Sequence, residues 1–200
     1  MKLVFSAASP FVRKVHVVLH ETGLLDEVEI VPVATTPFDS PAEVVAANPL
    51  GKIPALIRDE GPSIYDSRVI CRYLDDRAQA GLYPQARLWE VLTLEATADA
   101  IMEAAISIVY EHRFRPPEKV YDGWCDVQWG KVERAVEALN ARWMSHLNGP
   151  LDAGQIAVGC ALGYLDFRLA ERNWRKGNDA LDDWFAVFAE REAMQATRPE

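Results

Sequence analysis

The segment Ser-Pro-Phe-Val-Arg-Lys at residues 9–14 is suited to binding a negative charge. Ser is a favoured helix N-cap and Pro a favoured first helical residue, so a helix should begin at Pro10. The Ser9 hydroxyl and the free backbone N–H groups there favour an anion, and the helix dipole adds about half a positive charge. A thiolate is such an anion. In the simpler interpretation Ser9 only caps the helix, and the two roles are compatible.

A second segment, Asn-Pro-Leu-Gly-Lys-Ile-Pro-Ala-Leu at residues 48–56, has the features of a peptide-binding loop. Two turn signals precede the Ile53–Pro54 bond at the start of an apolar strand, and X-Pro is the only common place for a cis peptide bond. In the cis form, the N–H and C=O of Ile53 can turn outward and pair with a peptide ligand. An ordinary loop is the alternative.

The third segment is Tyr65-Asp66-Ser67, directly before an apolar helical run. Asp66 is placed as an N-cap beside unpaired N–H groups. Such a corner suits a ligand that carries both a carboxylate and an ammonium group. A plain helix cap is again the alternative.

Other polar groupings carry weaker hypotheses. His16 and His20 lie one helical turn apart, but a third ligand and an H-E-x-x-H motif are missing, so we expect no metal site. Glu95, Asp99 and Glu103 form an acidic stripe with a spacing of four residues, which is typical of a solvated helix face.

The elements that position these segments change character near residue 80. Residues 1–78 alternate strand-like and helical runs, which predicts an α/β layer in the order β-α-β-α-β-β-α. Turn residues at 79–87 form a linker, and residues 88–200 read as helical throughout. The expected strands are 2–6, 28–33, 54–58 and 63–65; the expected helices are about 10–22, 41–47, 67–77, 88–114, 118–147, 154–172 and 181–193.

The third helix of the C-terminal half has a defined start. Asp152 followed by Gln155 has the spacing of a capping box. The apolar stretch 156–165 after it is about half as long as a membrane span. We therefore expect a buried core helix and no membrane partner.

Composition narrows the class of protein. Half of the 200 residues are apolar, enough for a substantial core. The net charge of −9 opposes binding to nucleic acid, whose phosphates attract Lys and Arg. The three cysteines are far apart, which predicts no disulfide framework and favours a reducing compartment. With no secretory signal visible, we expect the protein in the cytoplasm.

The three segments, in this order and at this spacing, resemble the glutathione S-transferase superfamily. The stretch 156–167 is similar to the buried helix of that family's second domain, and the resemblance covers nearly the whole chain. It is closest to the small bacterial branch of YibF-like proteins. The resemblance implies a thioredoxin-like α/β domain at 1–78, a linker at 79–87, an all-α domain at 88–200 and a homodimer.

The resemblance also implies a glutathione site. In that family the position of Ser9 often donates a hydrogen bond to the glutathione sulfur, which makes Ser9 the expected catalytic residue. No tyrosine stands at the end of the first strand, so Ser6 is left as a competing hydroxyl. The implied glutathione-binding residues are Phe11, Lys52, Ile53, Pro54, Asp66 and Ser67.

Each part of glutathione has an expected partner. Ile53 would pair with the cysteinyl backbone beside Pro54, Asp66 and Ser67 would hold the γ-glutamyl end, and Lys52 would approach the glycyl carboxylate.

The resemblance also implies ligand contacts from residues of the first long helix. In related dimers an acidic residue of this helix approaches glutathione in the neighbouring subunit, which makes Asp99 a candidate for that contact. Tyr110 and Arg113 are candidates for the pocket of the acceptor, a small hydrophobic electrophile.

The expected function is therefore that of a glutathione transferase in detoxification. Lowering the thiol pKa by two units from about 8.5 requires about 2.7 kcal/mol, the scale of one charge-assisted hydrogen bond plus a helix end. A non-catalytic binding or regulatory protein with the same fold is the alternative. A cysteine-dependent reductase fits poorly because no cysteine lies near Ser9.

Overall fold

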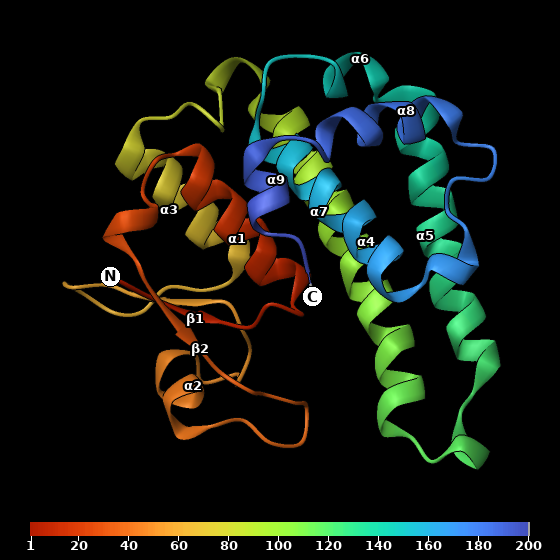
Figure 1. The fold of residues 1–200 in the computed structure, drawn as a ribbon, viewed down its shortest axis with the longest axis horizontal. Coiled ribbons are helices and arrows are strands. Elements are labelled where there is room, and N and C mark those ends of the chain that lie inside the picture. The colour runs from red at the N-terminus through yellow and green to blue at the C-terminus, as the bar shows by residue number, and fades with distance from the viewer. Residues whose placement is uncertain (200) are drawn as a thin grey trace. The chain divides into compact units, whose positions relative to one another are not determined.

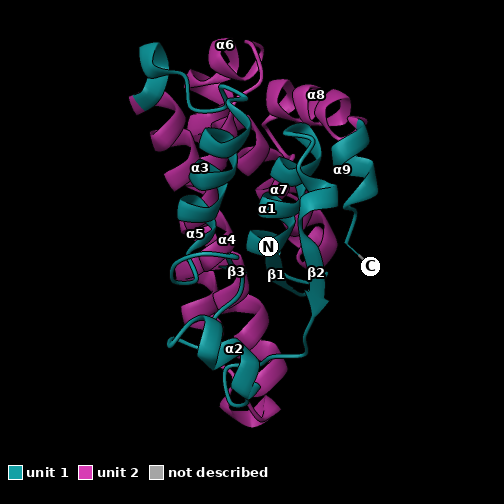
Figure 2. Cartoon of the chain, turned by 90° about the vertical axis from the view of Figure 1, so that its left-hand side faces the viewer, with its two compact units in different colours: residues 1–88, 192–200 teal, residues 89–191 magenta. Residues whose placement is uncertain are grey.

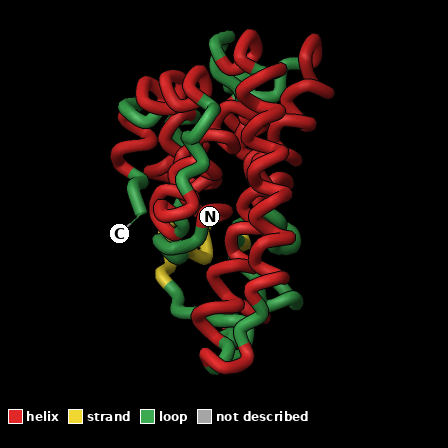
Figure 3. Tube along the Cα trace, turned by 90° about the vertical axis from the view of Figure 1, so that its right-hand side faces the viewer, coloured by secondary structure: helices red, strands yellow, loops and turns green. Residues whose placement is uncertain are grey.

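The computed structural model describes residues 1–199, which divide into two compact units (Figure 2). The first unit consists of Met1–Leu88 and the C-terminal segment from Glu192; the second is Trp89–Arg191. Within the described residues, strands occur in the first unit alone, and the second is built from helices and loops (Figure 3). The fold class expected from the sequence, α/β followed by all-α, is confirmed.

The strands are β1 (Lys2–Phe5), β2 (Glu29–Pro32) and β3 (Ala55–Ile57). The helices of the first unit are α1 (Pro10–Glu21), α2 (Ala42–Ala47), α3 (Ser67–Ala78) and α9 (Glu192–Ala196). Those of the second are α4 (Leu88–Phe114), α5 (Asp122–Arg142), α6 (Met144–Leu147), α7 (Ala153–Arg168) and α8 (Asp179–Phe188).

The sheet of the first unit has the order β2-β1-β3, with β1 parallel to β2 and antiparallel to β3. Helices α1 and α3 cover one side and α2 the other (Figure 1). Val4 and Ala55 pack with Val44 and Ala47 of α2 in a core. The strand expected at 63–65 is reduced to one bridge between Leu56 and Ile64.

Helix α1 begins and packs as its sequence predicts. Ser9 is its N-cap, and Val15, Val18 and Leu19 are fully buried. The buried Arg13 links this helix to the C-terminal segment. Its Nη2 donates to the carbonyl of Met194 at 3.1 Å, and its Nε lies 3.5 Å from the Thr197 hydroxyl.

In the C-terminal half of the chain, the expected helix at 88–114 is observed as α4, whereas two expected helices are divided. The run 118–147 is split between α5 and α6 at Trp143, and the run 181–193 is split between α8 and α9. The helix expected at 154–172 is observed as α7, which ends at Arg168, four residues earlier than expected. None of the described helices has the length and apolarity to cross a membrane.

The start of α7 is held by a buried polar group. Asp152 is fully buried, and its Oδ1 accepts a hydrogen bond from the Gln155 backbone at 3.1 Å. Its Oδ2 lies 2.7 Å from Nε2 of His146. The Gln155 side chain does not complete a capping box, because its Nε2 lies 3.0–3.2 Å from the carbonyls of His146, Gly149 and Pro150.

The sequence predicted that the acidic stripe on α4 is a solvated helix face. This prediction is wrong for two of its three residues. Glu95 and Asp99 are buried, with 1% and 4% of their surface exposed, and Glu103 alone of the three is exposed. Their spacing of four fixes a shared face but carries no information on what covers it.

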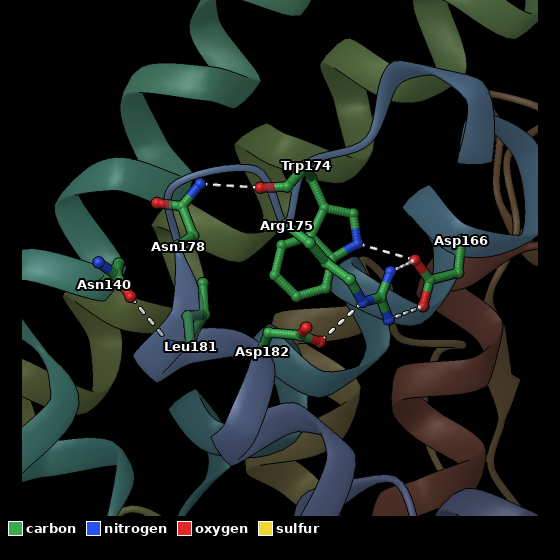
Figure 4. A network of polar contacts seen from close by, with 7 residues as sticks. All are labelled: Asn140, Asp166, Trp174, Arg175, Asn178, Leu181 and Asp182. Atoms are coloured by element: carbon green, nitrogen blue, oxygen red, sulfur yellow. Dashed lines mark hydrogen bonds and ion pairs between the residues drawn. The ribbon is translucent and has the colours of Figure 1, made fainter.

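The connection from α7 to α8 is held by an ionic network (Figure 4). The Arg175 guanidinium donates through both Nη1 and Nη2 to Asp166, the latter at 2.7 Å, and through Nε to Asp182 at 2.7 Å. The Trp174 indole also donates to Asp166, at 2.8 Å. The hydrogen bonds with Asp166 hold the pKa of Arg175 above its usual value.

We expect Asp166→Ala to lower the free energy of unfolding by about 2 kcal/mol, because three donors lose their acceptor while the group stays partly solvated. Urea denaturation measures the change. Asp183→Ala is the matched control, since Asp183 is an exposed carboxylate on α8. A difference below about 0.5 kcal/mol between the two variants would contradict the assignment.

Candidate functional site

The register of the sheet brings the three segments singled out from the sequence to one edge of the sheet, the end at which β1 finishes and β3 begins. Val4 pairs with Ala55, so the chain leaves β1 toward Ser9 beside the Ile53–Pro54 entry to β3. On the other side of β3, Leu56 and Ile64 exchange backbone hydrogen bonds at 2.9 Å in antiparallel sense. The segment from Ile64 therefore runs to the same edge, where Asp66 begins α3.

At this edge the Ser9 hydroxyl already acts as a helix cap. Its Oγ accepts a hydrogen bond from the Val12 backbone at 3.3 Å, a long contact, and the side chain is half-buried. Ser6 is also half-buried, and Phe11 lies in the first turn of α1. A hydroxyl that accepts with its lone pair keeps its proton for a second partner.

The loop before β3 is shaped by Asn48, which is buried. Its Nδ2 donates to the carbonyl of Lys52 at 2.9 Å, and its Oδ1 accepts from the Leu50 backbone at 3.0 Å. Gly51 has φ +64, and a Cβ there would lie 2.7 Å from the Ser40 hydroxyl, so glycine is required. The Lys52 side chain is exposed.

The Ile53–Pro54 peptide bond is cis. Within residues 1–199, the Ile53 N–H and C=O have no hydrogen-bond partner. Ile53 thus offers one donor and one acceptor from the same residue. That pair matches the backbone of an extended peptide, as in the addition of a strand to a sheet edge.

Asp66 and Ser67 form the start of α3. The Asp66 Oδ1 caps the Arg68 N–H at 3.1 Å, and its Oδ2 lies 3.0 Å from the Arg68 guanidinium. Burial raises the pKa of Asp66, but the hydrogen bonds and charge of Arg68, together with the charge of Lys14, outweigh it and lower the pKa. Asp66 is therefore a carboxylate at neutral pH.

Ser67 offers a hydroxyl to a ligand at this corner. The residue is 2% exposed, and in the described part of the chain its hydroxyl has no hydrogen-bond partner. Its oxygen still reaches solvent, because among the described residues Asn178 Oδ1 is the side-chain atom that is both fully buried and unpaired. A ligand carboxylate here would meet the Ser67 hydroxyl and the free N–H groups of the helix start, with Asp66 beside it for an ammonium group.

Sequence reasoning missed two charged residues of this edge, Lys14 and Arg68. Lys14 is 1% exposed, and its charge acts on Asp66, which links α1 to the start of α3. The only signal for Arg68 was its place two residues after an N-cap aspartate. No sequence feature indicated that Lys14 would be buried.

The remaining candidates lie on α4. Asp99 is buried, Tyr110 is 40% exposed and Arg113 is exposed. The Tyr110 ring contacts Phe114 edge to face at 5.1 Å between centroids, and the Arg113 guanidinium lies 5.3 Å from the same ring.

The histidine pair on α1 is a ring contact. His16 and His20 have ring centroids 5.1 Å apart, and burial together with the charge of His20 lowers the pKa of His16. Among residues 1–199, no group of three or more His, Cys, Asp or Glu side chains could hold a metal ion. The thiols of cysteines 71, 125 and 160 are buried and form no disulfide among the described residues.

Two known family models match most of this chain. Residues 8–77 match the family model described as the glutathione S-transferase N-terminal domain, and residues 95–186 match the one for the C-terminal domain. The chain is 31% identical to the uncharacterized GST-like protein YibF of Escherichia coli K12, and the match covers all of this chain and 98% of that protein.

Two similar solved structures come from a glutathione transferase family member of Pseudomonas fluorescens Pf-5. One, with bound glutathione, is 43% identical with a TM-score of 0.97, and the match covers 100% of this chain and 98% of that one. The other, with bound S-(propanoic acid)-glutathione, is 42% identical with a TM-score of 0.92 and full coverage of both chains.

Proposed function

Because this chain belongs to the glutathione S-transferase family, we propose that it binds glutathione at the sheet edge and activates its thiol. The observation that carries the proposal is the register, which gathers Ser9, Ile53 and Ser67 at one end of β1 and β3. The Pseudomonas fluorescens relative with bound glutathione supports it.

Each group of the edge matches one part of glutathione. The γ-glutamyl carboxylate takes the Ser67 hydroxyl and N–H groups, and its ammonium group takes the Asp66 carboxylate. The cysteinyl backbone pairs with the N–H and C=O of Ile53, with Pro54 beside it. Lys52 is close in sequence and attracts the glycyl carboxylate.

Phe11 supplies an apolar contact in the first turn of α1, next to the thiol position. The thiol itself lies at the start of α1, where the Ser9 hydroxyl and the helix dipole stabilise its thiolate.

The proposed reaction needs little from the protein besides positioning and anion stabilisation. The thiolate sulfur forms a bond to an electrophilic carbon. In a substitution the electron pair of the broken bond departs with the leaving group; in an addition it moves to the adjacent carbon, which then takes a proton. The acceptor is a small electrophile with an apolar body, for which Tyr110 and Arg113 are proposed contacts.

The proposed setting is detoxification in the cytoplasm, where free thiols such as Cys71 stay reduced. The relative with bound S-(propanoic acid)-glutathione supports an acceptor of only a few carbon atoms.

Calorimetry with glutathione tests the binding step. We expect Asp66→Ala to weaken binding by about 1.5 to 3 kcal/mol, because an ammonium group loses its charged acceptor. Asp66→Asn retains the helix cap and isolates the charge. Asp76→Ala, an exposed carboxylate on α3, is the control and should bind normally. Failure of the wild type to bind millimolar glutathione would refute the proposal, and binding without conjugation would favour the non-catalytic alternative.

Ser9→Ala separates capping from catalysis. As a cap alone, Ser9 contributes about 0.5 to 2 kcal/mol of stability and leaves the pKa of bound glutathione unchanged. We expect that pKa to rise and turnover near neutral pH to fall, with affinity nearly constant, because other residues hold the tripeptide. The thiolate absorbance of bound glutathione, recorded against pH, measures this pKa. Ser6→Ala is the control. If the curve shifts only in Ser6→Ala, the role belongs to Ser6.

We also expect a homodimer, formed by the exposed face of α4. Trp89 is 76% exposed, and the small exposed residues Thr93, Ala96 and Ala100 follow along the same face. In sedimentation experiments, Ala96→Arg should change the measured mass from that of a dimer to that of a monomer. Ala186→Arg, on the exposed face of α8, is the control and should leave the dimer intact. A monomeric wild type at tens of micromolar would exclude both the dimer and a cross-subunit contact by Asp99.

A further inference from the structure

Arg13 of α1 carries a positive charge into the interior of the first unit. The residue is 8% exposed, and its guanidinium contacts two neutral oxygens, the Met194 carbonyl and the Thr197 hydroxyl. Among residues 1–199, Arg13 forms no ion pair. Charged side chains are rarely buried without an opposite charge, because removing a charge from water is costly. Arg13 is therefore a buried cation that has hydrogen-bond acceptors but no compensating carboxylate.

The acceptors on the α9 side are themselves fixed in place. The Thr197 hydroxyl donates to the Ala193 carbonyl at 2.8 Å, so it can accept from Arg13 with its lone pairs. Ala193, Met194 and Thr197 are each more than nine-tenths buried. Helices α1 and α9 contact each other, and both belong to the first unit (Figure 2). The guanidinium is thus held at one position by a buried set of acceptors.

Arg13 is also connected to the start of α1. Its backbone N–H donates to the Ser9 carbonyl at 3.0 Å, which is the first hydrogen bond of the helix. Helical side chains lean toward the N-terminus, so Arg13 lies over the turn that follows Ser9. Four residues correspond to about 6 Å along a helix axis. The buried charge is therefore close to the end of the helix that presents its free N–H groups.

A cation at this position favours an anion at the helix start. With an effective dielectric constant of about 20, opposite charges about 10 Å apart interact strongly enough to shift a pKa by about one unit. Salt screens a buried charge less than an exposed one. The charge also has the same sign as the partial charge that the helix dipole places at this end. The two effects therefore add.

The other charges around α1 do not duplicate that of Arg13. Lys14 is also buried, but its charge acts on the Asp66 carboxylate at the start of α3. Burial, together with the charge of His20, lowers the pKa of His16, so this ring is neutral near pH 7. Two charged residues of the segment that contains α9 are exposed to solvent, Glu192 and Arg198.

We propose that Arg13, anchored by Met194 and Thr197, is a positioning residue of this transferase whose buried charge stabilises the glutathione thiolate at the start of α1. The inference rests on the proposed function, because it names a further group that acts on the same thiolate. It also gives the segment from Glu192 a role in the reaction without any contact with glutathione.

The pKa of the bound glutathione thiol, read from its absorbance against pH, tests the inference. We expect Arg13→Met to raise this pKa by about one pH unit, because the side chain keeps its length and loses its charge. Turnover at neutral pH should fall by up to about tenfold with the thiolate fraction. Arg13→Lys restores the charge and should keep the pKa near the wild-type value. Arg72→Met, which removes an exposed charge from α3 of the same unit, is the matched control.

Glutathione affinity provides a second readout that a merely structural role would not produce. Below the thiol pKa the ligand is bound as the neutral thiol, so Arg13→Met should bind it within about twofold of the wild type. Above the wild-type pKa the variant should bind more weakly, by up to about tenfold, because the thiolate has lost its stabilising charge.

A pair of variants at Thr197 tests the charge while Arg13 stays in place. Thr197→Asp sets a carboxylate beside the guanidinium and should raise the thiol pKa as Arg13→Met does. Thr197→Asn is similar in shape but uncharged, and should leave the pKa unchanged. This pair keeps the inference testable if Arg13→Met does not fold.

The outcomes separate the two proposals. A wild type that does not bind glutathione, or binds it without lowering the thiol pKa, refutes the proposed function and this inference with it. A lowered wild-type pKa that stays unchanged in Arg13→Met, or in Thr197→Asp, overturns this inference alone. Equal rises in Arg13→Met and Arg13→Lys also overturn it, since the geometry of the guanidinium and not its charge would then be responsible.

Discussion

The pairing of β3 with β1 on one side and with Ile64 on the other determines where the proposed glutathione-binding groups of the first unit lie. A shift of register by one residue would turn each side chain of β3 to the opposite face. It would also move Ile53 away from the start of α1 and move Asp66 along the edge. The sheet has three strands, so a few backbone hydrogen bonds determine the relative positions of these residues. The core of Val4, Val44, Ala47 and Ala55 keeps that register in place.

The second unit depends in a similar way on the start of α7. A helix that is buried along nearly its whole length must satisfy its free N–H groups inside the protein. One carboxylate oxygen of Asp152 accepts a hydrogen bond from the Gln155 backbone N–H, and the other lies beside Nε2 of His146. The Gln155 side chain donates to carbonyls of the preceding segment. Helix α7 then presents its far end, with Tyr164 and Arg168, beside α4.

Residue chemistry that acts locally could be predicted from the sequence. Ser9 and Asp66 are caps because of their residue types and neighbours, and α4 has the predicted bounds because turn residues precede it and prolines follow it. The break at Trp143 could not be predicted, since Ala141-Arg142-Trp143-Met144 contains no helix breaker and packing decides. The burial of Lys14, Glu95 and Asp99 was equally invisible, because the spacing of charges is the same on a buried face as on a solvated one.

The contact of Arg13 with the C-terminal segment has a consequence for how the protein is made. Domains generally begin to fold during synthesis, in the order in which they leave the ribosome. Here α1 is synthesised first, yet among residues 1–199 the buried Arg13 guanidinium finds acceptors only at Met194 and Thr197. The N-terminal unit is therefore completed by residues about 180 positions further along the chain. A nascent chain cannot bury Arg13 together with these two acceptors until residues 194 and 197 have left the ribosome, so packing of α1 is delayed until the second unit has been synthesised.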